Sequence, residues 1–219
     1  MSLHRRVDAR ARARAGASAV ALVAGVLAVT GAAAAVPQTV PQWLFAIGHA
    51  KALAVDLVSP ASQPPLTVTS PAFRDQGAIP CRSTQYCGNV FPGLAWSAGP
   101  AGTRSYVVIM QGPGEGTRIS LHLIVFNISA GVRRLPTGMT TPPTGAGLGP
   151  NVHGLHHTYA GPHPHDGGRN EYHLQVFALN AYLHVSRSVT FERLIAAMKG
   201  HVLADGQLVG FAVKPSSQR

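Results

Sequence analysis

Acidic side chains are scarce in this 219-residue chain, which has 8 Asp and Glu against 18 Lys and Arg. A glycoside hydrolase needs two carboxylates that flank the scissile bond, and so few acidic residues make such a pair unexpected. Charged residues make up only 12% of the chain and apolar residues 46%, the reverse of the balance that keeps a chain disordered. The 24 glycines and 17 prolines argue against a bundle of long helices. The composition therefore predicts a folded domain that is rich in turns.

Catalytic signature motifs are missing as well. The sequence has no P-loop, no G-x-S-x-G nucleophile elbow and no H-E-x-x-H metal motif. The glycine-rich segment 145–149 follows Pro142 and Pro143 rather than a strand, so it lacks the helix N-terminus that would bind a pyrophosphate. These absences indicate a protein that is not an enzyme and uses no cofactor. The alternative is a hydrolase with His122 as its general base.

Part of the formal net charge of +10 comes from the N-terminus. Five of the 18 basic residues are Arg5, Arg6, Arg10, Arg12 and Arg14. Subtracting these five, and one acidic residue in the same stretch, leaves 13 basic and 7 acidic residues scattered beyond residue 35. No basic run with interleaved aromatic residues follows, so we expect no binding of nucleic acid.

Residues 1–35 have the order of a secretory signal peptide, with an Arg-rich start, an uncharged apolar stretch and small residues at 31–35. We expect cleavage near Ala35 and an exported protein, either secreted or in the cell envelope. The alternative is an uncleaved signal anchor, because the uncharged stretch 15–36 is long enough to cross a bilayer. Alanine dominates that stretch, and its weak hydrophobicity favours cleavage. Contact with a membrane is expected only if the signal stays uncleaved.

The two cysteines, Cys81 and Cys87, both follow the signal. Export would bring them into an oxidising compartment, so the sequence favours a disulfide that closes this short loop. Two unpaired thiols are the alternative, and the C-x5-C spacing specifies no metal by itself.

Short β-rich runs alternate with turns along the mature chain, which predicts a mainly β fold. Residues 36–64 are expected to hold a short amphipathic helix over 41–58 and a linker, 65–214 the main domain, and 215–219 a tail. Strands are predicted at residues 66–69, 105–110, 122–128, 172–179 and 208–213.

A second helix is predicted over 191–198, because Thr190 can cap it, Glu192 lies in its first turn and Gly200 follows its end. The segment 138–168 is rich in glycine and proline and is expected to be a loop.

Histidines are concentrated in and just after this loop. Six of the eleven fall within 21 residues, and they are His153, His156, His157, His163, His165 and His173. Neutral imidazoles bind Zn²⁺, Cu²⁺ or Ni²⁺. We expect a polar loop without a metal, with an exported His-rich metal-binding protein as the alternative.

Short segments between Leu66 and Val213 follow one another in an order that is typical of a known family. They cover residues 66–73, 79–80, 89–96, 100–103, 122–128, 135–138, 151–154, 159–164, 172–179, 197–204 and 208–210. In this order and spacing the chain resembles the phosphatidylethanolamine-binding protein family, in its bacterial branch of Raf kinase inhibitor-like proteins.

The resemblance implies a β-sandwich-like fold around a large central sheet, with a few short helices. It also implies a small polar pocket for anions such as phosphate or phospholipid headgroups. The positions that match the family's pocket are His122, Gly161, Pro162, Pro164 and Tyr172.

The family's acidic pocket segment is altered in this chain. Pro113 is kept, but Gln and Gly stand where relatives carry Asp, and we expect Gln111 to line one wall. Without that Asp, the pH dependence of anion binding should follow His122 alone, near its ordinary pKa of about 6.5. Affinity should then fall as the pH rises through that value.

Together these patterns predict an exported, non-enzymatic binding protein with a pocket for a small anionic or phosphorylated ligand. A regulatory role through an unidentified protein partner is a variant of the same prediction.

Overall fold

The computed structural model describes residues 48–60, 64–154, 158–165 and 168–216. The predicted signal, residues 1–35, lies outside these ranges. The elements in chain order are β1 (His49–Ala50), α2 (Ala54–Val58), β2 (Val68–Thr69), β3 (Gly77–Ala78), the 3-10 turn η1 (Cys81–Ser83), β4 (Leu94–Trp96), β5 (Ser105–Pro113), β6 (Ile119–Ser129), β7 (Arg134–Leu135), β8 (Gly147–Leu148), β9 (Asn170–Leu179), α3 (Phe191–Met198) and β10 (Val202–Ala212).

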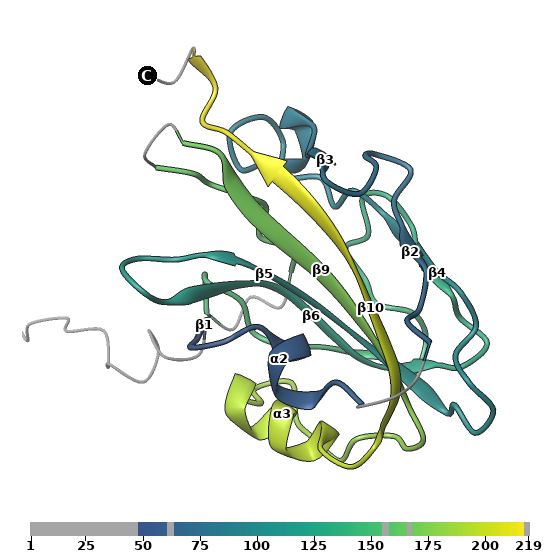
Figure 1. The fold of residues 1–219 in the computed structure, drawn as a ribbon. Coiled ribbons are helices and arrows are strands. Elements are labelled where there is room, and N and C mark those ends of the chain that lie inside the picture. The colour runs from purple at the N-terminus through teal and green to yellow at the C-terminus, as the bar shows by residue number, and fades with distance from the viewer. Residues whose placement is uncertain (1–47, 61–63, 155–157, 166–167, 217–219) are drawn as a thin grey trace, which may run out of the picture. The chain divides into compact units, whose positions relative to one another are not determined.

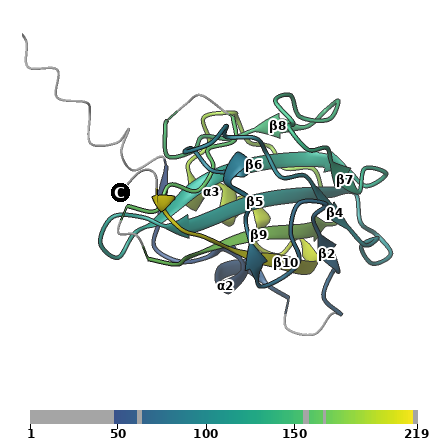
Figure 2. The same ribbon diagram turned by 90° about the horizontal axis from the view of Figure 1, so that it is seen from above.

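Most of these strands form one large sheet. Within the described ranges it has seven strands, in the order β1-β6-β5-β9-β10-β3, with β8 paired to β6. The long strands β6, β5, β9 and β10 are antiparallel neighbours, whereas β3 joins β10 in parallel. A smaller sheet has the order β2-β4-β7 (Figures 1 and 2). The predicted mainly β fold, with a large sheet and a few short helices, is confirmed.

The large sheet is covered on both faces. Along β5, the side chains of Tyr106, Val108 and Met110 pack in a core that includes residues of the smaller sheet. Val107 and Ile109 point the other way, into a core that includes residues of α2 and α3. We call the first face the site face and the second the helix face. Burial on both faces explains why β5 is almost continuously apolar rather than alternating.

The helix α3 has the bounds that the sequence predicts. The Thr190 side chain accepts a hydrogen bond from the Arg193 N–H, and Glu192 lies in the first turn. Gly200 follows the end of the helix with a positive φ of 78°, a conformation that glycine adopts without strain. None of the helices in the described ranges is long and apolar enough to cross a membrane.

The N-terminal helix is shorter than the sequence predicts. Only Ala54–Val58 is helical, and His49–Ala50 forms β1 on the edge of β6. Residues 41–47 of the predicted helix lie outside the described ranges. The exposed edge of β6 offers hydrogen bonds to an extended segment, and this tertiary pairing overrides the helical pattern.

The last strand begins earlier than predicted, at Val202 rather than at residue 208. Asp205 and Gly206 suggest a turn in the sequence, but they continue the ladder with β9. A Cβ atom on Gly206 would lie 2.1 Å from the carbonyl oxygen of Leu66. The glycine therefore allows the chain that leads to β2 to pack directly on β10.

Candidate functional site

A β-bulge directs His122 toward the site face. Met110 pairs with Leu123 and Gln111 pairs with Leu121, so His122 is the extra residue on β6. The His122 ring meets the Tyr172 ring edge to face, with 5.2 Å between centroids. The fold thus brings together two of the residues that the resemblance implies for the pocket.

Ala160 fixes His122 through two hydrogen bonds. The Ala160 N–H donates to the His122 carbonyl at 2.9 Å, and the Ala160 carbonyl accepts from Nδ1 at 2.7 Å. A carbonyl oxygen can only accept, so the imidazole proton is held on Nδ1. The other ring nitrogen, Nε2, is buried and has no hydrogen-bond partner within the described residues. Neutral His122 therefore presents one unused acceptor atom.

Burial lowers the pKa of His122 to about 4. The backbone of Ala160 and Gly161 opposes this shift by hydrogen bonding, while the charges of His153 and His49 add to it. His122 is consequently neutral at pH 7. The sequence-based expectation of a titration near 6.5 is therefore wrong for this side chain, because it took the imidazole to be solvated.

One wall of the site is the loop 159–165, which is bonded to the disulfide loop, residues 81–89. Cys81 and Cys87 are joined by a disulfide, with 5.4 Å between their Cα atoms. The Asn89 amide accepts from the Gly161 N–H at 2.6 Å and donates to the Tyr159 carbonyl at 3.0 Å. The two loops therefore form one unit beside His122.

The predicted prolines lie within this wall. The Pro162 carbonyl accepts from the Gln85 N–H at 3.1 Å, and the Pro164 carbonyl accepts from the Tyr86 hydroxyl. The Gln85 amide also donates to the Gly161 carbonyl at 2.8 Å. The prolines act through their carbonyl groups, which attach the wall to the disulfide loop.

Two glycines make the close contacts of the site possible. A Cβ atom on Gly161 would lie 2.4 Å from the Ser83 carbonyl oxygen, so only glycine fits between the two loops. A Cβ atom on Gly112 would lie 2.2 Å from Tyr172, so the absence of a side chain there makes room for the phenol ring.

Gln111 does not line this site, contrary to the sequence-based expectation. Its side chain is fully buried on the helix face, where Oε1 accepts from the Ala54 N–H at 2.7 Å. The same oxygen accepts from Gln175 at 2.9 Å, and Gln111 Nε2 donates to the Ala52 carbonyl at 3.1 Å. Neighbouring positions on a strand face opposite sides, so Gly112 rather than Gln111 faces Tyr172. Pro113 is exposed at the end of β5.

The described histidines of the 153–173 cluster are spread over several contacts. His163 Nδ1 lies 3.3 Å from His165 Nε2, His153 contacts Gln85, and His173 contacts Glu171. No group of three or more His, Cys, Asp or Glu side chains in the described ranges converges as a set of metal ligands. His156 and His157 lie outside those ranges.

Sequence reasoning missed the residues of the disulfide loop that build the site. Gln85 and Asn89 bond the opposite wall, and Tyr86 stacks on His163 with 4.5 Å between ring centroids. The Tyr159 hydroxyl donates to the Ser83 carbonyl at 2.7 Å. Cys81 and Cys87 marked this loop in the sequence, but nothing in it indicated that the loop packs on residues 159–165.

Comparison with known proteins identifies the family. Residues 69–212 match the family model described as phosphatidylethanolamine-binding protein. A UPF0098 protein of Methanothermobacter thermautotrophicus is 32% identical over 142 residues, which cover 64% of this chain and 93% of that protein. A Mycobacterium tuberculosis protein that carries the name lipoprotein LppC is 32% identical over 162 residues, covering 73% of this chain and 79% of that one.

Solved structures agree with this assignment. A phosphatidylethanolamine-binding protein homolog from Chlamydia trachomatis has a TM-score of 0.61 and 29% identity, covering 69% of this chain and 99% of that one. Escherichia coli YbcL has a TM-score of 0.64 at 23% identity, covering 69% of this chain and all of its own, and supports the fold. The match to the family model and the identity with its relatives together show that this chain belongs to the phosphatidylethanolamine-binding protein family.

Proposed function

We propose that the chain is an exported, non-enzymatic binding protein that takes up a small phosphorylated group at the site around His122. The observation that carries this proposal is the unused Nε2 of His122, a buried acceptor whose ring is held in place by Ala160. Buried polar atoms in folded proteins nearly always have a partner. A ligand with a hydrogen-bond donor would provide the partner that His122 Nε2 lacks.

The protonation state of His122 restricts the ligand. With its proton on Nδ1 and its pKa lowered to about 4, the imidazole accepts a hydrogen bond at Nε2 and does not act as a cation at pH 7. A phosphomonoester that carries one proton has a P–OH group that can donate to this atom. Its second pKa is about 6, so the donor is lost as the pH rises through that value. Affinity should therefore follow the titration of the ligand rather than that of His122.

The site is closed in this structure. The Nε2 atom is buried and the His122 side chain is only 4% exposed. A ligand can therefore reach Nε2 only when neighbouring side chains move. The wall formed by residues 159–165 lies beside the His122 ring, because Ala160 contacts both the backbone and Nδ1 of His122.

Titrations followed by NMR would test the proposal, with inorganic phosphate and sulfate as probes for the wild type, His122→Ala and His184→Ala. His184 is exposed and serves as the matched control. We expect phosphate to bind the wild type and the control more tightly at pH 5.5 than at pH 7.5. His122→Ala should lose this binding, and sulfate should bind weakly because it has no proton to donate. Equal affinities of the wild type and His122→Ala for phosphate would overturn the assignment.

Export is supported by the signal-like residues 1–35 and by the relative that carries the name lipoprotein LppC. N-terminal sequencing of material from the host should show a start near Ala35. Full-length protein in the membrane fraction would favour an uncleaved anchor, and full-length soluble protein in the cytoplasm would contradict both.

The proposal of a non-enzymatic role is supported by the surroundings of His122, where the described residues include no nucleophile with an oriented base. The ring contacts Ala160 and Tyr172, and both hydrogen bonds of Ala160 serve to hold it. A screen with esterase and phosphatase substrates should show no turnover. Activity that disappears in His122→Ala would instead identify a hydrolase.

A further inference from the structure

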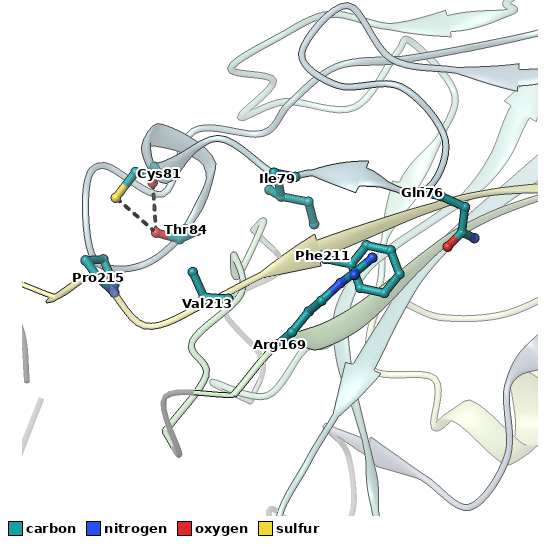
Figure 3. Close-up of a pocket in the computed structure, with 9 residues that line it drawn as sticks. Gln76, Ile79, Cys81, Thr84, Arg169, Phe211, Val213 and Pro215 are labelled. Carbon is teal, nitrogen blue, oxygen red and sulfur yellow. Dashed lines mark hydrogen bonds between the residues drawn. The ribbon is translucent and has the colours of Figure 1, made fainter.

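A second pocket lies at the edge of the large sheet, where β3 and β10 end (Figure 3). Its volume is about 370 Å³, within the range of small-molecule sites. It shares no residue with the contacts of His122. Cys81 and Thr84 of the disulfide loop line it from one end.

Apolar side chains form most of this pocket. Ile79 and Phe211 lie side by side, because the Ile79 N–H donates to the Phe211 carbonyl at 2.7 Å. Val213 continues the same surface and is 53% exposed. An apolar ligand body would cover this exposed hydrophobic surface.

One cation lies against this apolar surface. The guanidinium carbon of Arg169 lies 3.4 Å from the centroid of the Phe211 ring (Figure 3). The ring engages the face of the guanidinium, so the N–H groups in its plane remain available to a ligand. The acidic side chain closest in sequence, Glu171, instead contacts His173 at 3.2 Å. Within the described residues Arg169 has no carboxylate partner.

The charged residues next to the lining are of both signs, because Asp75 precedes Gln76 and its carboxylate accepts from the Val209 N–H at 2.8 Å. Lys214 lies between Val213 and Pro215, which both line the pocket. Arg169 is charged and itself lines the pocket, whereas no acidic side chain of the described residues does, so the pocket favours an anion over a neutral ligand.

We infer that this pocket binds a small carboxylate with an apolar, preferably aromatic, body. The two carboxylate oxygens accept from the planar fork of Arg169, an arrangement that arginine supports and lysine does not. The body of the ligand lies on Ile79, Phe211 and Val213. This site is distinct from the proposed phosphate site, because its lining does not include His122, Ala160 or Tyr172, although both sites adjoin the disulfide loop.

Three probes separate the parts of this inference in titrations of the full chain followed by amide NMR. Phenylacetate has both the charge and the ring, phenylacetamide lacks the charge, and acetate lacks the ring. We expect phenylacetate to shift the amide signals of Ile79, Thr84 and Phe211, and to bind at least about tenfold more tightly than either of the other two. Equal binding of phenylacetate and phenylacetamide, or no binding of phenylacetate at millimolar concentration, would overturn the proposal.

Variants assign the site. Arg169→Gln should weaken phenylacetate binding by about tenfold or more. Arg104→Gln is the matched control, because Arg104 also lies over an aromatic ring, that of Tyr182, at 5.9 Å. Val213→Glu, at an exposed position, should abolish binding by repulsion without disturbing the core. His122→Ala should bind phenylacetate like the wild type, so failure here is distinguishable from failure of the phosphate site. Unchanged affinity of Arg169→Gln for phenylacetate would contradict the assignment. Loss of phenylacetate binding in His122→Ala would contradict it as well, because the ligand would then occupy the phosphate site.

Discussion

The two faces of the large sheet differ in whether their buried polar groups have hydrogen-bond partners. On the helix face, the amides of Gln111 and Gln175 bond each other and the backbone where α2 begins, at Ala54 and Val55. On the site face and beside it, three buried polar atoms have no partner among the described residues. These atoms are His122 Nε2, Ser83 Oγ and Trp96 Nε1.

This difference distinguishes buried polar groups that stabilise the fold from those that are candidates for ligand binding. A buried network in which each member is bonded holds elements in one arrangement, here α2 on the sheet. A buried polar atom without a partner costs stability, so its presence needs another explanation, such as a ligand. The contrast therefore predicts which substitutions destabilise the fold and which alter binding.

The largest effect is expected on the helix face. Gln111→Leu leaves the Ala54 N–H, the Ala52 carbonyl and one Gln175 donor without their partner. We expect a loss of about 3 kcal/mol in the free energy of unfolding, measured by denaturant titration. Gln207→Leu, at an exposed position, is the control and should change stability by less than about 0.5 kcal/mol. Equal effects of the two substitutions would contradict a structural role for the buried amide network.

On the site face, His122 should make the fold sensitive to acid. Its pKa is about 4 in the folded state and 6.5 when the side chain is solvated, so the unfolded chain binds more protons between these values. The free energy of unfolding should therefore fall by about 2 kcal/mol from pH 7 to pH 5 through this group alone. Stability curves at both pH values for the wild type and His122→Gln measure the difference. Parallel loss of stability in the two proteins would show that His122 does not titrate in this way.

The disulfide should contribute a similar or smaller amount. Cys81 and Cys87 are six residues apart, and closing so short a loop stabilises the fold by roughly 2 kcal/mol. A thiol count on unreduced, denatured protein from the exported fraction should find no free thiol. Reductant should weaken phosphate binding as well as stability in the wild type, and should leave the double variant with Cys81→Ser and Cys87→Ser unchanged. Two free thiols in the exported protein would contradict the bond.

The smallest effect is expected at Ser83. Its hydroxyl oxygen is buried without a partner, so Ser83→Ala removes no hydrogen bond. We expect a change within about 0.5 kcal/mol in the free energy of unfolding, measured under the same conditions as Gln111→Leu. A loss of more than about 1 kcal/mol in the free energy of unfolding would show that the Ser83 hydroxyl makes a stabilising hydrogen bond, as the amides on the helix face do. The contrast between the two faces would then be weaker.

The sequence predicts the parts of this molecule that depend on local pattern. The strands β5, β6 and β9 and the helix α3 are visible in runs of apolar residues and in the cap at Thr190. Gln111 was assigned to the wrong face, because sequence does not show which way a side chain on a bulged strand points.

The properties that depend on packing could not be predicted. The lowered pKa of His122 results from burial, which the residue type does not reveal. The contacts of Gln85 and Asn89 with Gly161 join segments more than 70 residues apart. The pocket beside Arg169 likewise depends on Phe211, which belongs to the last strand.

The parallel pairing of β3 with β10 has a consequence for how the protein folds. Asp75 accepts a hydrogen bond from the Val209 N–H across 134 residues of sequence, and the Leu66 N–H donates to the Asp205 carbonyl. The beginning of the domain is thus held by its last strand. Pairing between such distant segments is slow, because the chain loses the entropy of a long loop before any contact compensates for it. A chain that has emerged only as far as α3 still lacks the strand that holds residues 66–79, so the large sheet is completed only after β10 has been synthesised.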